Sequence, residues 1–218
     1  MDIKEFICCE KARADGFRLL SACFYQPEKD VFLKEGIFKN LASLLQQVSP
    51  DASVFVGEME KSFSRYSEKE LNVDYAKLFV GPNDLLAPPY GSVYLDGGRR
   101  VMGDSTMEVI KVYEEQGLVM DRDFKNLPDH ITVELEFIYY LIFKEIEALE
   151  RSDMHGAYEF IKEQKFFLDR FLKSWIGPFC DKMKEGAMSE FYRSLADCVC
   201  TFIRNAGPGD TLPAELCQ

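Results

Sequence analysis

Apolar side chains recur at steps of three and four residues along most of the chain, which is the period of an amphipathic α-helix. The first stripes comprise Ile3, Phe6, Ala14, Phe17, Leu20 and Phe24; Phe38, Leu41, Leu45 and Val48; Phe55, Met59, Phe63 and Tyr66; and Leu71, Tyr75, Leu78 and Phe79. The later stripes comprise Ile110 and Tyr113; Ile131, Leu135, Ile138, Ile142, Ile146 and Leu149; Phe160, Gln164, Phe167, Phe171 and Trp175; and Met188, Phe191, Leu195, Val199 and Phe202. No segment alternates convincingly with the period of a strand. The pattern therefore predicts an all-α fold, a single globular bundle of about eight to ten helices.

Proline and glycine indicate where these helices end. Pro50 follows the second stripe, and Gly81-Pro82 follows the fourth. Proline lacks a backbone donor and clashes with the preceding turn of a helix, so both positions predict a helix end. For the same reason Gly177-Pro178 predicts a break after the seventh stripe.

Several residues have the spacing of helix caps. Ser105 and Glu108 fit a capping box, in which each side chain satisfies a backbone amide of the other residue. Gly117 suits the C-terminal cap of the same helix. Asp153 is expected to open a helix, and Asp129 suits the positive end of the helix that starts near Ile131.

Helical periodicity fails between residues 81 and 104, where three prolines and five glycines exclude a regular helix. The segment is nevertheless apolar, whereas a flexible linker is polar. We therefore expect an ordered Pro-rich loop that lies on the bundle. A small hairpin is expected within it, with Val93–Leu95 and Arg100–Met102 flanking the turn at Asp96-Gly97-Gly98.

The chain is acidic, with 26 Lys and Arg against 37 Asp and Glu and a formal net charge of −11. This balance argues against a nucleic-acid partner or an anionic membrane surface, and it favours a basic partner such as a positive peptide. The first residues lack the pattern of a secretory signal, and no stretch approaches the ~20 apolar residues that span a bilayer. A cytoplasmic protein without an integral membrane segment is expected.

Candidate chemistry is sparse. The seven cysteines form no C-x-x-C pair, so we expect most of them to be reduced thiols packed in the core rather than metal ligands. Phosphate-binding loops, H-E-x-x-H and the G-x-S-x-G elbow are all absent from the sequence, and only two histidines occur, His130 and His155. Neither a catalytic residue nor a metal site is predicted, and the protein is not expected to be an enzyme.

Two multi-residue segments match a known family. Residues 74–82 read DYAKLFVGP and residues 87–94 read APPYGSVY, while residues 127–137 read LPDHITVELEF. In order and spacing these segments resemble the signatures of the TorD/DmsD/NarJ family of cytoplasmic chaperones for molybdopterin oxidoreductases. The resemblance covers about residues 1–205. The family often carries His-Leu before the tryptophan of a late helix, and the matching positions here are Arg170 and Phe171, before Trp175. No role of that histidine is therefore transferred.

The resemblance implies a cofactor-free helical chaperone over residues 1–205, with possible lobes at 1–125 and 126–205 joined by a hinge and a loosely ordered tail at 206–218. Such a protein binds the twin-arginine leader or the body of a molybdoenzyme catalytic subunit and supports cofactor insertion before export. It occurs as a monomer or as a domain-swapped dimer. Weak binding of guanine nucleotide is a further property implied by the resemblance.

The residues expected to bind the leader peptide form an apolar groove beside a carboxylate: Tyr75, Leu78, Phe79, Pro88, Pro89, Tyr90, Asp129, His130 and Glu134. Aromatic side chains offer apolar area at a low entropy cost, and Asp129 is expected to pair with a leader arginine with help from Glu134. An alternative interpretation of Leu78 and Phe79 is that they are simply core residues.

Two other functions remain open at this stage. One is an assembly scaffold for a reductase subunit without a leader, as in the NarJ branch. The other, less favoured because no phosphate-binding loop exists, is a nucleotide-binding enzyme.

Overall fold

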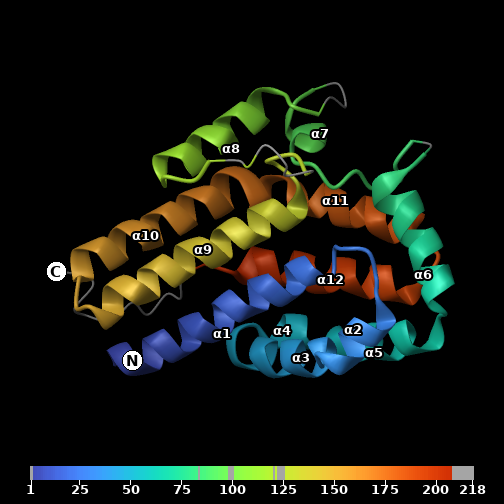
Figure 1. The fold of residues 1–218 in the computed structure, drawn as a ribbon, viewed down its shortest axis with the longest axis horizontal. Helices are drawn as coiled ribbons and strands as arrows, with labels where there is room; N and C mark the ends of the chain where they lie inside the picture. Colours follow the sequence, from blue (N-terminus) through green and yellow to red (C-terminus); the bar gives the residue numbers. More distant parts are fainter. Residues whose placement is uncertain (1, 83, 98–100, 120, 122–125, 208–218) are drawn as a thin grey trace.

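Helices account for the regular structure of the chain (Figure 1). The computed structural model describes residues 2–82, 84–97, 101–119, 121 and 126–207. The α-helices are α1 (Ile3–Ala22), α2 (Lys29–Lys34), α3 (Ile37–Val48), α4 (Pro50–Ser53), α5 (Val56–Arg65), α6 (Glu68–Tyr75), α7 (Ser92–Leu95), α8 (Asp104–Glu115), α9 (Ile131–Glu150), α10 (Met154–Phe167), α11 (Lys173–Gly186) and α12 (Glu190–Asn205). Two π-helical turns, η1 (Ala76–Val80) and η2 (Leu168–Leu172), complete the set. Over the described ranges no strand forms, which confirms the all-α prediction.

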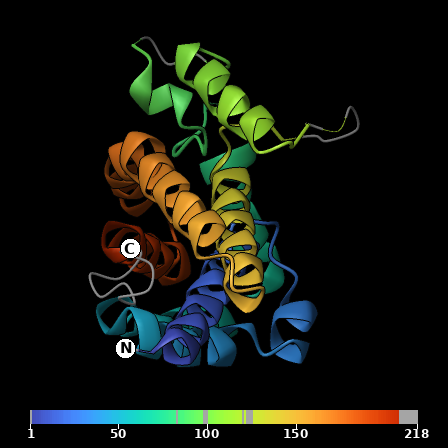
Figure 2. The same ribbon diagram turned by 90° about the vertical axis from the view of Figure 1, so that its left-hand side faces the viewer.

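The core lies between long helices that pack side by side. Helix α9 packs against both α1 and α10, and α12 packs against α5 and α11 (Figures 1 and 2). Aromatic rings join these layers: the Phe17 and Phe202 centroids are 4.8 Å apart, and those of Phe63 and Phe191 are 4.9 Å apart. All four rings are buried, as the apolar stripes predict.

Helix α10, η2 and α11 follow one another without a break, so the predicted interruption at Gly177-Pro178 is wrong. Pro178 lies inside α11. The wide turn η2 comes directly before that helix, and such a turn changes the local hydrogen-bond ladder. In contrast, the predicted end at Gly81 is confirmed, because its amide donates to the Ala76 carbonyl at 2.8 Å and its φ is +100°.

The segment between η1 and α9 differs most from its prediction. Val93–Leu95 belong to the short helix α7, so the expected hairpin does not form, and Arg100 lies outside the described residues. The expected capping box of Ser105 is also wrong. The Asp96 carboxylate accepts hydrogen bonds from the Ser105 amide and hydroxyl, the latter at 2.8 Å, and so holds the start of α8 from the preceding loop. Gly117 has a φ of +73° just after α8, as its predicted cap role requires.

A buried polar network joins α1, α9 and α10. The Arg13 guanidinium donates to the Glu10 carboxylate and to the Gln164 side chain, and it lies 3.9 Å from the Glu145 carboxylate. The Gln164 amide in turn donates to Glu145 at 2.6 Å. Glu145 is fully buried. A single cation therefore faces two carboxyl groups inside the core.

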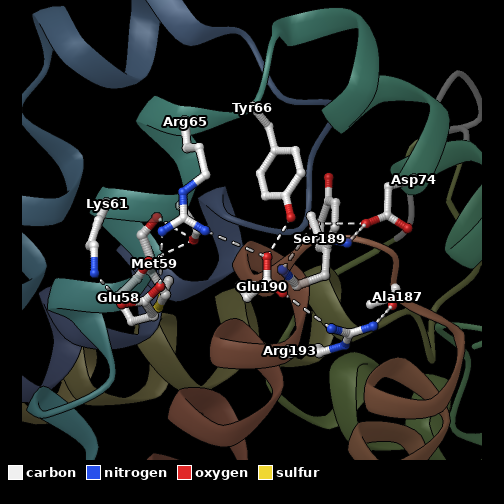
Figure 3. A network of polar contacts seen from close by, with 12 residues as sticks. Glu58, Met59, Lys61, Arg65, Tyr66, Asp74, Ala187, Ser189, Glu190 and Arg193 are labelled. Atoms are coloured by element: carbon white, nitrogen blue, oxygen red, sulfur yellow. Dashed lines mark hydrogen bonds and ion pairs between the residues drawn. The ribbon is translucent and has the colours of Figure 1, made fainter.

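A second polar network fixes α5, α6 and α12 (Figure 3). The buried Asp74 carboxylate accepts hydrogen bonds from the Met188 and Ser189 amides at 3.0 and 2.8 Å and from the Ser189 hydroxyl at 2.7 Å. The Tyr66 hydroxyl donates to Glu190, which begins α12. Asp74, the first residue of the DYAKLF segment, therefore anchors the turn before α12 to the helix that precedes η1.

Candidate functional site

The two signature segments of the sequence meet in space. Tyr90 and His130 form an isolated antiparallel bridge, flanked by a hydrogen bond from the Gly91 amide to the Asp129 carbonyl and another from the Ile131 amide to the Pro89 carbonyl, both at 2.9 Å. The Pro-rich loop is thereby held against the start of α9. This backbone pairing brings Pro89 and Tyr90 next to Asp129 and His130, all of which belong to the expected site.

Asp129 stabilises the loop rather than lying at the surface. Its carboxylate accepts a hydrogen bond from the Ser92 amide at 2.8 Å, at the first residue of α7. The side chain is buried, and its second oxygen has no partner among the described residues. The helix start that Asp129 serves is thus α7 and not α9, and in this conformation its carboxylate is closed off from a guest arginine.

His130 is the residue that caps α9. Its Nδ1 accepts a hydrogen bond from the Thr132 amide at 3.2 Å, and its ring lies 5.3 Å from the ring of Tyr90. Burial lowers the pKa of His130 to about 4, against the opposing effect of Asp129. The imidazole is therefore neutral at pH 7, which agrees with its role as an acceptor.

Glu134 lies below the same loop. The Trp175 indole donates to its carboxyl at 3.0 Å, and burial raises the pKa of Glu134 well above its ordinary value. Gly91 passes so close that an added Cβ would lie 3.1 Å from the Trp175 indole nitrogen and 3.3 Å from Glu134. A buried carboxyl group, an indole and a glycine thus pack together beneath the loop.

Leu78, Phe79 and Pro89 are also buried. Phe79 packs edge to face against Phe24 and Tyr192, with ring centroids 6.0 and 5.6 Å apart. These residues belong to the core in this structure. Of the expected groove residues, Tyr75, Pro88 and Tyr90 retain partial exposure.

Pro88 and Tyr90 line a shallow cavity of about 240 Å³. Leu85 and Val93 add further apolar walls, while Asp84, Val101 and Lys182 complete the lining. Two of the three predicted residues that remain accessible, Pro88 and Tyr90, therefore border one small pocket of mixed polarity at the Pro-rich loop, and Tyr75 does not line it.

A larger apolar groove lies along the next turns of α9. It encloses about 310 Å³ and is lined by Tyr113, Leu118, Val119, Asp121, Val133, Glu136, Phe137 and Tyr140. Apart from the two carboxylates, these side chains are aliphatic or aromatic. The groove is formed between α9 and the segment that ends α8.

Glu136 is an exposed acidic residue of this groove, and sequence reasoning did not include it in the site. Its carboxylate accepts hydrogen bonds from the Tyr25 hydroxyl at 2.8 Å and the Ser21 hydroxyl at 3.0 Å. Burial and the bond to Glu136 raise the pKa of Tyr25 to about 12, so its hydroxyl stays a donor. The signal in the sequence was the E-L-E spacing: two residues apart on a helix, Glu134 and Glu136 face different sides.

Tyr75 and Tyr90 are half-buried, and Tyr25, which donates to Glu136, is more exposed. Burial raises the pKa of Tyr75, and the nearby Tyr90 adds to the effect. Tyr75 in turn contributes to the raised pKa of Tyr25. Tyr75 therefore lies within electrostatic range of both Tyr90 and Tyr25.

Arg170, at the position where the family often has another residue, forms an ion pair with Glu108 at 2.6 Å. The pair links η2 to α8 on the surface. Within the described part of the chain no cluster of His, Cys, Asp or Glu could hold a metal ion, and no helix there is long and apolar enough to cross a membrane.

The protein is thus an all-helical bundle with a Pro-rich segment packed on it and an apolar groove rimmed by acidic side chains. The sequence model of the nitrate reductase delta subunit family matches residues 38–181, and the chain belongs to this family. The signatures noted in the sequence are thereby confirmed as family signatures.

Relatives support this membership. The chain is 24% identical over 235 residues to the chaperone protein TorD of Shewanella pealeana, an alignment that covers 98% of this chain and 99% of the relative. It is 27% identical over 184 residues to the Tat proofreading chaperone DmsD of Haemophilus influenzae, with 82% of each chain covered. Its identity to TorD of Vibrio parahaemolyticus is 28%, over 63% of each chain.

A solved structure shares the fold. It is that of a redox enzyme maturation protein from Archaeoglobus fulgidus, which aligns with a TM-score of 0.52 and 21% identity and covers 90% of this chain and 93% of that one. At this identity the likeness concerns the fold alone.

Proposed function

We propose that this protein is a chaperone that binds the twin-arginine leader of a molybdoenzyme catalytic subunit and retains the subunit until cofactor insertion is complete. The single observation that carries the proposal is the apolar groove on α9 with the Glu136 carboxylate at its rim. The names of the TorD and DmsD relatives support the same function. The protein would act in the cytoplasm, where leader-bearing precursors are made, and by binding rather than by catalysis.

The groove suits the chemistry of such a leader, which carries adjacent arginines beside an apolar stretch. Tyr113, Val133 and Tyr140 offer apolar contact area for that stretch. The Glu136 carboxylate is held in place by two hydroxyl donors and remains exposed, so it can accept a guanidinium in a charge-assisted pair. The net charge of −11 favours the approach of a basic peptide.

Calorimetric titration with a synthetic leader peptide tests this site. We expect Glu136→Gln to weaken binding by about 1–3 kcal/mol, the range for an interface anchor, and to reduce its dependence on salt. Glu147→Gln is the matched control, because Glu147 lies on the same helix and pairs instead with Lys144 and Arg151. It should bind the peptide as the wild type does.

The competing location is the pocket at Pro88 and Tyr90. If Tyr90→Ala abolishes binding while Glu136→Gln leaves it unchanged, the groove on α9 is not the leader site. The titration is run without nucleotide and repeated with GTP, since binding is proposed to need no cofactor. Binding that is seen only after GTP is added would contradict that part of the proposal.

The match to the nitrate reductase delta subunit family favours a second candidate, the assembly of a reductase subunit without a leader. The two functions separate in a pull-down that uses a client subunit with and without its leader. Retention of the leader-free subunit by both wild type and Glu136→Gln would favour the assembly function.

A further inference from the structure

Helices α11 and α12 form an antiparallel pair joined by a short turn (Figure 1). Two contacts fix their register. An added Cβ at Gly177 would lie 3.0 Å from the Arg204 guanidinium, and the Lys184 ammonium is 3.3 Å from the Asp197 carboxylate. Both helices advance by the same number of residues between these contacts, so the positions midway along them face each other.

Cys180 on α11 and Cys200 on α12 occupy these midway positions. The two side chains lie near enough for each to shift the pKa of the other: Cys180 lowers the pKa of Cys200, and Cys200 raises that of Cys180. Both cysteines are free, with Cys180 buried and Cys200 partly exposed. A protected thiol thus lies directly behind one that solvent can reach.

We propose that Cys180 and Cys200 form a peroxide-reactive thiol pair that closes reversibly to a disulfide between α11 and α12. This pairing lies outside the groove on α9 and does not depend on the proposed leader binding. Helices α11 and α12 already pack side by side, and closure would bring the two sulfur atoms to the bonded distance of about 2 Å.

The charges around the pair favour a thiolate at Cys200. Cys180, Arg204 and Lys184 together lower the pKa of Cys200 to about 7, with Cys180 having the largest effect, against burial and Asp181, which raise it. Lys184 is itself shared between Asp181 and Asp197, at 3.2 and 3.3 Å. A substantial fraction of Cys200 is therefore thiolate at pH 7, which is the reactive form.

The partner thiol has the opposite character. Burial raises the pKa of Cys180 well above its ordinary value, so this thiol stays protonated until its neighbour has reacted. The two residues thus divide the roles of attacking and resolving thiol.

The reaction consumes one hydrogen peroxide. The Cys200 thiolate attacks a peroxide oxygen, which breaks the O–O bond and gives a sulfenic acid and hydroxide, and the hydroxide takes a proton to become water. The Cys180 sulfur then attacks the Cys200 sulfur and expels the hydroxyl, which leaves as water with the Cys180 proton. Two thiols lose two electrons in total, and the peroxide is reduced to two waters. A small thiol such as glutathione restores the pair by exchange.

Other described cysteines lack this environment. Cys23 and Cys198 are both buried, and burial raises the pKa of Cys198 to about 12. Cys8 and Cys9 are exposed neighbours on α1, and burial with Cys8 raises the pKa of Cys9. Cys200 combines a neighbouring thiol, two nearby cations (Arg204 and Lys184) and partial exposure to solvent.

The test uses the full chain with Cys8, Cys9 and Cys217 changed to Ser, so that exposed thiols do not interfere. After treatment with one equivalent of hydrogen peroxide at pH 7, free thiols are blocked and tryptic peptides are analysed by mass spectrometry. We expect one linkage, between the peptides that contain Cys180 and Cys200, and its rate of formation should rise as pH increases from 6 to 8.

Single variants separate the two roles. Cys180→Ala should stop at a sulfenic acid on Cys200 that dimedone labels, whereas Cys200→Ala should remove both the linkage and the label. Cys198→Ala, on the same helix, should leave the linkage intact, and circular dichroism melts establish that each variant is folded. The absence of the linkage in the folded parent, a linkage of Cys23 to Cys198 instead, or dimedone labelling that survives Cys200→Ala would each overturn the proposal.

Discussion

Replacement of the buried Glu145 by Gln should stabilise the protein at neutral pH. Burial and the neighbouring Glu10 carboxylate raise the pKa of Glu145 from an ordinary value of 4.5 to about 8, although Arg13 opposes them. Folding therefore favours the protonated form. Because the unfolded chain releases this proton first, the free energy of unfolding falls as pH rises from about 4.5 to 8.

The size of the effect follows from the difference in pKa. At about 1.4 kcal/mol for each unit, Glu145 lowers the free energy of unfolding by up to about 3 kcal/mol at pH 7 and up to about 5 kcal/mol above pH 8. Gln has the shape of the protonated acid. It can still accept the Gln164 hydrogen bond, which is 2.6 Å long here, and donate toward Glu10.

Urea unfolding at pH 5, 6, 7 and 8, followed by circular dichroism, measures this difference. The stability curves of Glu145→Gln and wild type should coincide near pH 5 and then separate. Glu147→Gln, which removes a partly exposed carboxylate from the same helix, should follow the wild type over this pH range. Parallel curves for Glu145→Gln and wild type, or a variant less stable at pH 8, would show that the buried acid is not held protonated.

Two further substitutions test the supports of the site. His130→Asn keeps a cap acceptor for the Thr132 amide but cannot be protonated. Because burial lowers the pKa of His130 to about 4, the wild type should lose stability as pH falls from about 6.5 to 4. Urea unfolding over that interval should show a smaller loss for the variant. Asp74→Ala leaves the Met188 and Ser189 amides without their acceptor and should lower the free energy of unfolding by about 2–4 kcal/mol. Asp74→Asn keeps one acceptor and should lose less stability. Equal losses for the two variants in thermal melts would contradict the cap role.

The long helices could be predicted from the sequence because each carries its own apolar stripe. The stripe over Ile131 to Leu149 lies within α9, and that over Phe191 to Phe202 lies within α12. Short α2 offered too few residues to show a period and was missed. The start of α8 was assigned to a local capping box, but the carboxylate that holds Ser105 comes from Asp96 in the preceding loop. Contacts of this kind depend on the path of the loop, which local spacing does not encode.

The candidate site was predicted only in part, because the burial of its residues also depends on contacts with distant parts of the chain. Both signature segments were recognised, yet their residues were assigned to a groove when many of them pair with each other. Asp129 accepts from Ser92, and Glu134 accepts from Trp175, so both carboxyl groups are used inside the fold. Whether an acidic residue on a helix faces core or solvent depends on the neighbouring helices. Glu136, which faces out beside the groove, could be distinguished from Glu134 only once α1 was in place.

The wide turn η2 constrains how the length of this chain can vary. A π-helical turn contains one residue more than the α-helical turn that it replaces. Deleting one residue from Leu168–Leu172 would restore a regular helix, but it would rotate everything that follows by about 100° around the helix axis. Trp175 would then point away from Glu134, and Gly91 would lose the indole ring that packs against it. Relatives that keep the indole–carboxyl contact should therefore also keep the extra residue, which makes this turn a fixed point for aligning distant sequences.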